Sequence, residues 1–125
     1  MPNPETEAAI RVSNELFADL PRLCLGALSI RHMFGGAGLY AGKLFFACIF
    51  KGEIYLRADE AFACELAAEG SIQFTWENPK TGRELQMHYW RIPEAALDSP
   101  DRALDLAARS LGLAAAAKRT VRRRN

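Results

Sequence analysis

The N-terminal segment repeats small and apolar side chains at helical spacing. They occupy Ala9, Ile10, Ser13, Leu16, Phe17 and Leu20. This period places them on one face of a helix. Asn3 and Pro4 are typical of an N-cap and a first helical position, and Pro21 is expected to end the helix. The pattern therefore predicts an amphipathic helix before Pro21.

Strand-like patterns follow. Residues 27–34 are predicted to form a first strand that ends at a glycine-rich bend. The segment 43–50 is almost wholly apolar, which is typical of a strand covered on both faces, so we expect it in the centre of a sheet. Lys51 and Gly52 suit a tight turn, after which residues 53–57 alternate and complete a hairpin.

The second half of the chain predicts a helix and two further strands. Asp59 is suited to cap the helix, and Gly70 is placed to end it. Residues 73–77 and 84–91 are expected to form strands separated by a turn whose composition is polar. Pro93 is expected to end the second of these strands.

A last helix opens at Ser99 and Pro100 and is expected to reach about Lys118. Consecutive strands joined by short turns must run antiparallel. The order α-β(3)-α-β(2)-α therefore predicts an α+β fold of two layers, with an antiparallel sheet and helices on one of its faces. We assign residues 1–118 to one domain and 119–125 to a basic C-terminal tail.

Composition and charge limit the classes of protein to which the chain can belong. Half of the 125 residues are hydrophobic, which suffices for one core without disulfides or metal. No long apolar run and no signal-peptide pattern is present, so we expect a cytoplasmic protein without membrane contact. Five of the 16 basic residues lie at the C-terminal end: Lys118, Arg119, Arg122, Arg123 and Arg124. The other 11 face 15 acidic residues, so the body before them has a net charge of −4.

Three closely spaced glycines, Gly36, Gly38 and Gly42, invite comparison with phosphate-binding loops. Such a loop needs a helix directly after it, so that backbone N–H groups and the helix dipole meet the phosphate. The residues that follow are strand-like, which disfavours this interpretation. A structural role is favoured, because glycine permits positive φ, a bulge or the close approach of another backbone.

Few residues in the sequence indicate nucleophilic catalysis. Cys24, Cys48, His32 and His88 could form a thiol–histidine pair, but no third partner and no oxyanion motif accompanies them. The three cysteines are odd in number and lie far apart, which predicts neither a disulfide framework nor a zinc site. We therefore expect no catalytic residues, no cofactor and no metal.

The basic C-terminal residues could contact the phosphates of a nucleic acid. No aromatic residues lie between them, so base stacking by this segment is not expected. Nucleic-acid contact is therefore kept as an alternative to a solvated tail.

Several motifs, in a fixed order along the chain, resemble those of a known protein family. The stretch RHMFGGAGLY supplies Arg31, Met33, Phe34, Gly35, Gly36, Gly38, Leu39 and Tyr40. An apolar strand and the segment Ile54, Tyr55, Leu56, Arg57, Ala58 and Asp59 follow, and later come Tyr89, Trp90 and Pro93. In this order the motifs, over about residues 5–118, resemble the TfoX (Sxy) N-terminal domain family.

The resemblance implies a two-layer α+β domain similar to secretion-chaperone-like folds. It also implies a relation to bacterial regulators of competence, or DNA transformation, whose two-domain members carry a second helical domain. The chain resembles a standalone member that lacks this second domain. The family supplies no catalytic residues, so we expect a non-enzymatic regulatory or protein-interaction module. The alternatives are a nucleic-acid-associated accessory protein and an uncharacterised enzyme.

The apolar strand at 43–50 has a further implication. Helices cover one face of a two-layer sheet, so its second apolar face must meet solvent or a partner. Phe46, Tyr55, Tyr89 and Trp90 are the candidates for that face, depending on register. Because such patches are uncommon on monomers, we expect an unidentified protein partner and a two-fold homodimer.

Overall fold

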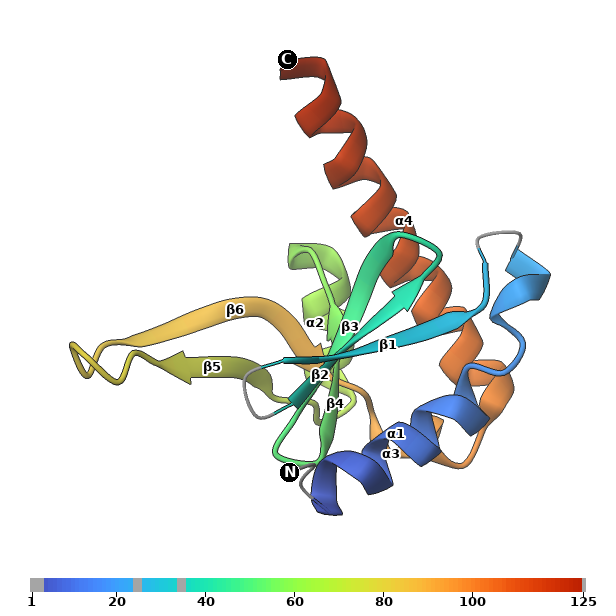
Figure 1. Ribbon diagram of the computed structural model, residues 1–125, viewed down its shortest axis with the longest axis horizontal. Coiled ribbons are helices and arrows are strands. Elements are labelled where there is room, and N and C mark those ends of the chain that lie inside the picture. Colours follow the sequence, from blue (N-terminus) through green and yellow to red (C-terminus); the bar gives the residue numbers. More distant parts are fainter. Residues whose placement is uncertain (1–3, 24–25, 34–35, 125) are drawn as a thin grey trace.

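The computed structural model describes residues 4–23, 26–33 and 36–124 (Figure 1). The strands are β1 (Leu28–Met33), β2 (Gly36–Ala41), β3 (Leu44–Phe50), β4 (Glu53–Arg57), β5 (Gln73–Glu77) and β6 (Glu84–Arg91). The helices are α1 (Pro4–Leu16), the short 3-10 helix η1 (Leu20–Leu23), α2 (Glu60–Ala68), α3 (Glu94–Leu97) and α4 (Pro100–Arg124). Asn3, the expected N-cap, and Cys24 lie outside the described residues.

The six strands form one sheet in the order β1-β2-β3-β4-β6-β5. Every neighbouring pair is antiparallel. Strand β3 lies inside the sheet, as its continuous apolar sequence predicted. The predicted α+β class with an antiparallel sheet is confirmed.

The β3–β4 hairpin turns at the two residues that the sequence indicated. Lys51 has a φ of 51° and Gly52 a φ of 79°, so both central residues are left-handed. This is the backbone sign pattern of a type I′ turn, whose twist matches that of the flanking strands. Glycine meets the requirement at no steric cost, and Lys51 meets it as a non-glycine residue.

Helix α2 has the ends that its sequence predicted. The Asp59 carboxylate accepts a hydrogen bond of 2.9 Å from the Phe62 amide, which caps the first turn. At the other end Gly70 has a φ of 91°. The Gly70 and Ser71 amides donate to the carbonyls of Ala67 and Leu66 at 3.0 Å each. These two bonds form a Schellman motif, which ends the helix where a glycine allows it.

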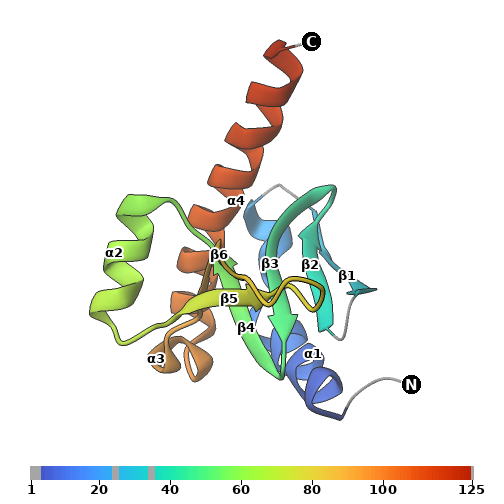
Figure 2. The same ribbon diagram turned by 90° about the vertical axis from the view of Figure 1, so that its left-hand side faces the viewer.

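The helices cover one face of the sheet, and Figure 2 shows α1 and α4 behind the strands. The core lies between these layers, where the rings of Phe17 and Phe46 meet edge to face with their centroids 5.5 Å apart. Leu56 and Leu111 are fully buried in the same cluster. The Ser110 hydroxyl of α4 donates a 2.8 Å hydrogen bond to the carbonyl of Arg57, which ties the long helix to β4.

The glycine-rich stretch corrects one prediction. The sequence predicted a bend, whereas the structure has strand β2 there, so four strands precede α2 instead of three. Gly36 is needed for close approach and not for positive φ: a Cβ on it would lie 1.9 Å from the carbonyl oxygen of Ile49. Only glycine lets β2 lie this near β3 at that point.

Helix boundaries also differ from the predicted ones. Helix α1 ends at Leu16, and the 3-10 helix η1 replaces its expected last turn. The short helix α3 was not predicted. Helix α4 continues beyond Lys118 as far as Arg124. No helix formed by the described residues is both long and apolar enough to cross a membrane.

Strands β5 and β6 and the turn between them form a projecting hairpin, which we call the arm (Figure 1). Strand β6 pairs with β4 only through Tyr89 to Arg91, and the rest of its length pairs with β5 alone. Two hydrogen bonds of 2.8 Å close the turn: the Asn78 amide donates to the Arg83 carbonyl, and the Gly82 amide donates to the Asn78 carbonyl. The arm therefore leaves the sheet and forms a corner with it.

Candidate binding groove

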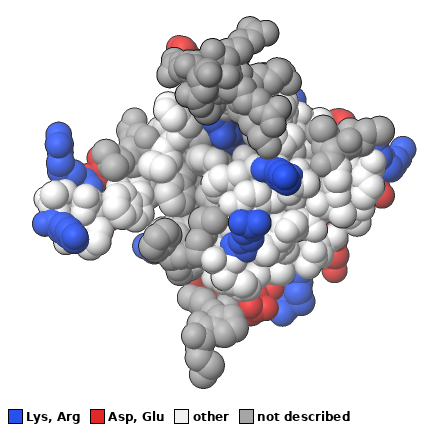
Figure 3. All heavy atoms as spheres, turned by 45° about the horizontal axis from the view of Figure 1, so that its top comes forward, with Lys and Arg blue, Asp and Glu red and all other residues white. Residues whose placement is uncertain are grey.

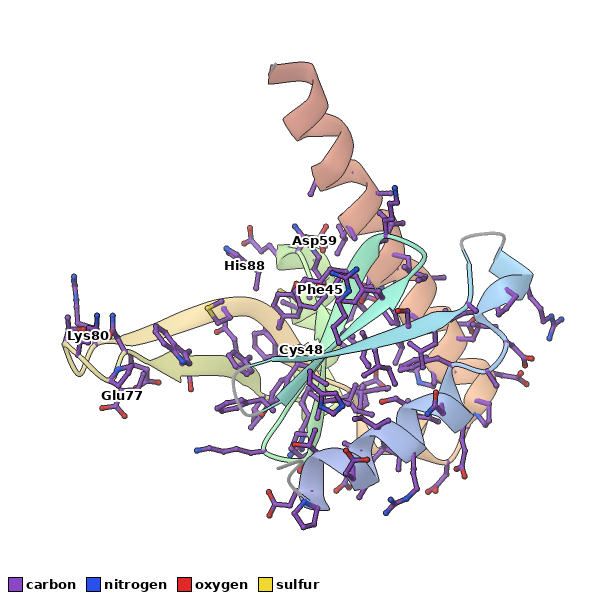
Figure 4. All side chains as sticks on the ribbon, viewed as in Figure 1. Phe45, Cys48, Asp59, Glu77, Lys80 and His88 are labelled. Carbon is purple, nitrogen blue, oxygen red and sulfur yellow. The ribbon has the colours of Figure 1, made fainter. Side chains whose placement is uncertain are left out.

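A groove of about 680 Å³ lies in the corner between strand β3 and the arm. It is lined by Gly36, Ala37, Phe45, Cys48, Ile49, Phe50, Phe74, Trp76, Glu77, Pro79, Met87 and Tyr89. Glu77 is the one charged residue among these described residues. Figure 4 places Phe45 and Cys48 at the root of the arm and Glu77 near its tip. The groove is apolar, with its acidic group at the outer end.

Aromatic rings from three strands form one end of the groove. Tyr40 on β2 stacks on Phe45 of β3, with ring centroids 5.0 Å apart and an angle of 21° between the planes. Tyr89 on β6 lies on the other side of Phe45, 5.8 Å away. We call these three residues the upper aromatic cluster.

A second aromatic cluster joins the sheet to the arm. Phe74 on β5 meets Phe50 of β3 edge to face at 5.2 Å and Tyr55 of β4 at 4.9 Å. Edge-to-face pairs at these distances stabilise beyond the area they bury, by about 0.5–1.5 kcal/mol each. These contacts fix the angle of the arm at its root, while Trp76 and Met87 farther out stay 39% and 37% exposed.

A β-bulge decides which phenylalanine faces the groove. Leu39 is paired with Ala47 and Tyr40 with Phe45, so Phe46 is the extra residue of β3. Phe46 turns into the core, where it is fully buried, and Phe45 turns into the groove. Bulges change the direction of side chains in this way, and a strict alternation along β3 would have exchanged the two rings.

Two arginine side chains lie next to the upper aromatic cluster. The Arg31 guanidinium lies over the Tyr40 ring, 5.3 Å from its centroid. Arg57 is the cross-strand partner of Tyr89 and lies beside its hydroxyl. In Figure 3 basic side chains occur in the middle of the visible face, and acidic ones lie mainly along its margins. Two cationic side chains therefore border the upper aromatic cluster, although neither is among the lining residues of the groove.

The Cys48 thiol and the Tyr89 phenol, which line the groove, are neutral at physiological pH. Burial raises the pKa of the Cys48 thiol from its ordinary 9.0 to about 12. Burial also raises the pKa of Tyr89, although the charge of Arg57 opposes this shift. A nucleophilic thiol needs a lowered pKa, so Cys48 does not have the properties of a reactive thiolate.

The chain matches the TfoX N-terminal domain family over residues 15–114. It belongs to that family. It is also 32% identical over 71 residues to protein Sxy of Escherichia coli (strain K12). This match covers 57% of the chain and 33% of Sxy, so the chain spans about a third of the length of that relative.

The structure of this TfoX N-terminal domain distributes the predicted motif over both faces of the sheet. Arg31, Tyr40, Tyr55 and Tyr89 lie in or beside the groove. Leu39 is fully buried in the core. Other members are placed by the backbone: Gly38 pairs with Arg31 and Cys48, Met33 ends β1, and Pro93 is the N-cap of α3. Phe34 and Gly35 lie outside the described residues.

Two candidates for the open face were wrong. Phe46 is buried against Phe17, because of the bulge. Trp90 packs against the core, because strand alternation sends it to the side opposite Tyr89. The arm residues Trp76 and Met87, which also line the groove, were not among the predicted residues. The period-2 pattern of β5 and β6 was the available signal.

A smaller cavity of about 390 Å³ in the TfoX N-terminal domain lies between α2 and the arm, lined in part by Asp59, Cys64, His88 and Trp90. Figure 4 shows Asp59 and His88 on this side of the arm. Among the described residues, no three His, Cys, Asp or Glu side chains are grouped so that they could hold a metal ion. Of the cysteines and histidines in the disfavoured thiol–histidine pairing, Cys48 lines the groove and His88 lines this cavity, so these two do not converge.

The basic C-terminal residues of the domain, Lys118, Arg119, Arg122, Arg123 and Arg124, lie in the last turns of α4. Figure 1 shows this end of the helix projecting away from the sheet. They are therefore carried by a continuous helix and are remote from the arm.

Proposed function

We propose that this chain is a non-enzymatic regulatory module, resembling the N-terminal domain of competence regulators, that acts in the cytoplasm by binding a protein partner. Its membership of the TfoX N-terminal domain family supports this. The observation that carries the proposal is a set of exposed apolar side chains at the arm: Ile72, directly before β5, is 54% exposed, and Trp76 and Met87 on the arm are 39% and 37% exposed. Large apolar side chains left exposed on a projecting element are typical of an interaction surface.

The open face has the composition of a contact site. Its aromatic and methionine side chains come from β3, β5 and β6, and Arg31 and Arg57 border them. Tyr, Trp, Phe, Met and Arg are the residue types enriched in protein interfaces. We infer that the partner contacts the groove side of the arm, where Trp76 and Met87 line the same groove as the glycine-rich strand β2.

We also propose that two copies associate through this surface as a homodimer. A two-fold pair would cover the exposed arm residues of both copies, and two-fold symmetry is the commonest arrangement of soluble oligomers. Light scattering at micromolar concentration tests this. A mass that stays at one chain at all concentrations would contradict the dimer without contradicting a different protein partner.

The partner proposal is tested by affinity capture and mass spectrometry with the full chain and the double variant Ile72→Ser/Trp76→Ser. The expected result is loss of the captured protein with this variant. Leu97→Ser is the matched control, because Leu97 is 39% exposed on α3, outside the arm. A protein that is lost equally with both variants, or with neither, would contradict the arm as its contact surface.

The alternative function is nucleic-acid contact through the basic end of α4. The continuation of the helix to Arg124 favours it, because this end of the helix projects away from the sheet in Figure 1. Binding of duplex DNA should then weaken steeply with added salt and disappear in a chain that ends at Ala117. Binding that survives the truncation would contradict this candidate.

A further inference from the structure

We propose that two copies of this chain join edge to edge, through an antiparallel pairing of strand β5 with β5 of the second copy that is centred on Thr75. This pairing rests on the proposed homodimer and deepens it, because it names the atoms that would join the two copies. The direction of the backbone groups of β5 and the order of its side chains support it.

Strand β5 forms one edge of the sheet, and in the described part of the chain no strand lies beyond it. Figure 1 shows β5 along the free side of the arm. An edge strand presents unpaired N–H and C=O groups, with which a strand of another chain can pair. A sheet that continued from one copy into the other would remove this edge from both.

The hydrogen bonds at the two ends of β5 determine which of its backbone groups point outward. The Ile72 carbonyl accepts from the Arg91 amide at 2.9 Å, and the Asn78 amide donates to the Arg83 carbonyl at 2.8 Å. In an antiparallel pair every second residue bonds to the same neighbour, and both ends assign the even-numbered residues to β6. The irregular register between β5 and β6 leaves this alternation intact, because the two ends agree. The outward backbone groups therefore belong to Gln73, Thr75 and Glu77.

One register pairs all of these outward residues in both copies. In a two-fold pair centred on Thr75, this residue lies opposite Thr75 of the second copy, and Gln73 lies opposite Glu77 of the second copy. A centre moved by one residue would leave one outward residue of each copy unpaired. A centre between two residues would place outward groups against groups that already bond to β6. The centre at Thr75 therefore forms the most backbone hydrogen bonds.

The same register places complementary side chains opposite each other. Phe74 lies opposite Trp76 of the second copy, and the two-fold axis forms this aromatic pair twice. Directly opposed aromatic side chains stabilise paired strands. Gln73 lies opposite the Glu77 carboxylate of the second copy. Its amide donates to the Met87 carbonyl at 3.0 Å and has a second N–H that suits a carboxylate.

Strand β1, at the opposite edge of the sheet, lacks this complementarity. Its residues include Arg31 and His32 and no acidic side chain. A two-fold pairing that used most of β1 would be centred near Ile30 and Arg31, so the Arg31 side chains of the two copies would lie close together. Like charges in such positions destabilise paired strands. Of the two edges, β5 is therefore the one suited to pairing with its own copy.

The substitution Thr75→Pro tests the pairing by light scattering at micromolar concentration. Proline removes the outward N–H of residue 75 and leaves the bonds between β5 and β6 in place, and edge strands accept proline at such positions. The expected result is a dimer for the wild type and a monomer for Thr75→Pro. Thr75→Val is the matched control, because it keeps the N–H and a branched side chain, and it should remain dimeric. Circular dichroism establishes that both variants are folded.

Substitutions at Gln73 test the register. Gln73→Lys places a cation opposite Glu77 of the second copy and should lower the dissociation constant of the dimer by up to about tenfold, since the pair forms twice. Gln73→Glu opposes two carboxylates and should raise this constant by a similar factor. Asn14→Lys and Asn14→Glu are the matched controls for net charge, because Asn14 is exposed on α1, and they should leave the dimer unchanged.

The outcomes separate the pairing from the homodimer on which it rests. A dimer that persists in Thr75→Pro would overturn the β5 pairing and leave the homodimer standing. Equal effects of Gln73→Lys and Gln73→Glu would overturn the register and the pairing with it. Wild-type chains that stay monomeric at all concentrations would overturn both proposals. If such monomers captured another protein and Thr75→Pro abolished the capture, β5 would pair with a strand of that protein and not with its own copy.

Discussion

Strand β3 contributes a phenylalanine to each face of the sheet, and the two rings differ in how deeply they are buried. On the helix-covered face, Phe46 is fully buried against Phe17, which directly follows α1. On the open face, Phe45 is half-buried, and its ring packs against Tyr40 of β2 and Tyr89 of the arm. Both rings come from neighbouring positions in one apolar run, so apolar character alone does not tell a core residue from a residue that lines a groove.

The difference comes from the element that covers each face. Helices α1 and α4 contact β3 and β4 and bury the side chains of these strands on the first face. The arm covers the second face only at its root, because β6 leaves the sheet after a short pairing with β4. A face covered by a hairpin at an angle keeps a groove, whereas a face covered by helices becomes a core.

The largest effect should come from separating β2 from β3, which would disrupt both faces together. Gly36→Val places a Cβ 1.9 Å from the carbonyl oxygen of Ile49, and backbone cannot yield without breaking the strand pair. We expect a loss of about 4 kcal/mol or more in the free energy of unfolding, the range of strained backbone sites. Urea denaturation measures it.

Gly112→Ala is the matched control for that experiment. Gly112 lies inside α4 with no atom within 4 Å of an added Cβ. Alanine should stabilise the helix by up to about 1 kcal/mol. Equal effects of the two substitutions would contradict the close approach at Gly36.

The paired variants Phe46→Ala and Phe45→Ala compare the two faces directly. Phe46→Ala leaves a cavity in a closed core and should cost about 3–5 kcal/mol of unfolding free energy. Phe45→Ala opens a face that solvent already reaches and should cost roughly 1–2 kcal/mol. If the two losses were the same, the open face would be as well packed as the covered one, and the comparison would fail.

Ser110→Ala tests the link between the faces. The hydroxyl on α4 donates to the Arg57 carbonyl, and the Arg57 side chain belongs to the open face. Its removal leaves a partly buried acceptor without its donor and should cost about 1–2 kcal/mol. Ser99→Ala is a weaker comparison, since its hydroxyl accepts the Arg102 amide at the exposed start of the helix at 3.4 Å. An effect no larger than that of Ser99→Ala would remove Ser110 as a structural link.

The smallest effect concerns pH and Cys48. Its folded pKa of about 12 exceeds the ordinary 9.0, so folding favours the protonated thiol. The associated stability is fully present below pH 9 and is lost as the pH rises toward 12. At pH 9.5 we expect Cys48→Ala to reduce the pH-dependent loss by less than about 1 kcal/mol. Cys64→Ala is the control, because it removes a thiol from an exposed position.

Local signals in the sequence predicted the elements that local chemistry controls. Asp59 and Gly70 set the ends of α2, and Lys51 with Gly52 set the β3–β4 turn, because each acts through its own backbone or an adjacent one. The α+β class followed from the order of these elements. Strand β2 was missed because glycine has a low strand propensity, and the contact that requires Gly36 lies on another strand.

The groove could be predicted only in part. An uncovered apolar face followed from the run at 43–50, and Tyr55 and Tyr89 were placed on it correctly. Its concave shape depends on the angle of the arm, which contacts such as Phe50 with Phe74 determine across the fold. Phe46 was misplaced because no local signal marks the bulged residue. The basic end of α4 was taken for a tail, although Lys and Arg have good helix propensities.

The extra residue in β3 affects how sequences of this family are aligned. Phe45, before the bulge, lies on the groove side of β3 together with Cys48, whereas Phe46 and Ala47 lie on the core side. Odd-numbered residues therefore face the groove before the bulge and the core after it. An alignment gap misplaced by one residue here would assign groove-facing positions of one protein to the hydrophobic core of another. The homologous position of the bulge, and not the apolar character of the strand, has to fix the alignment.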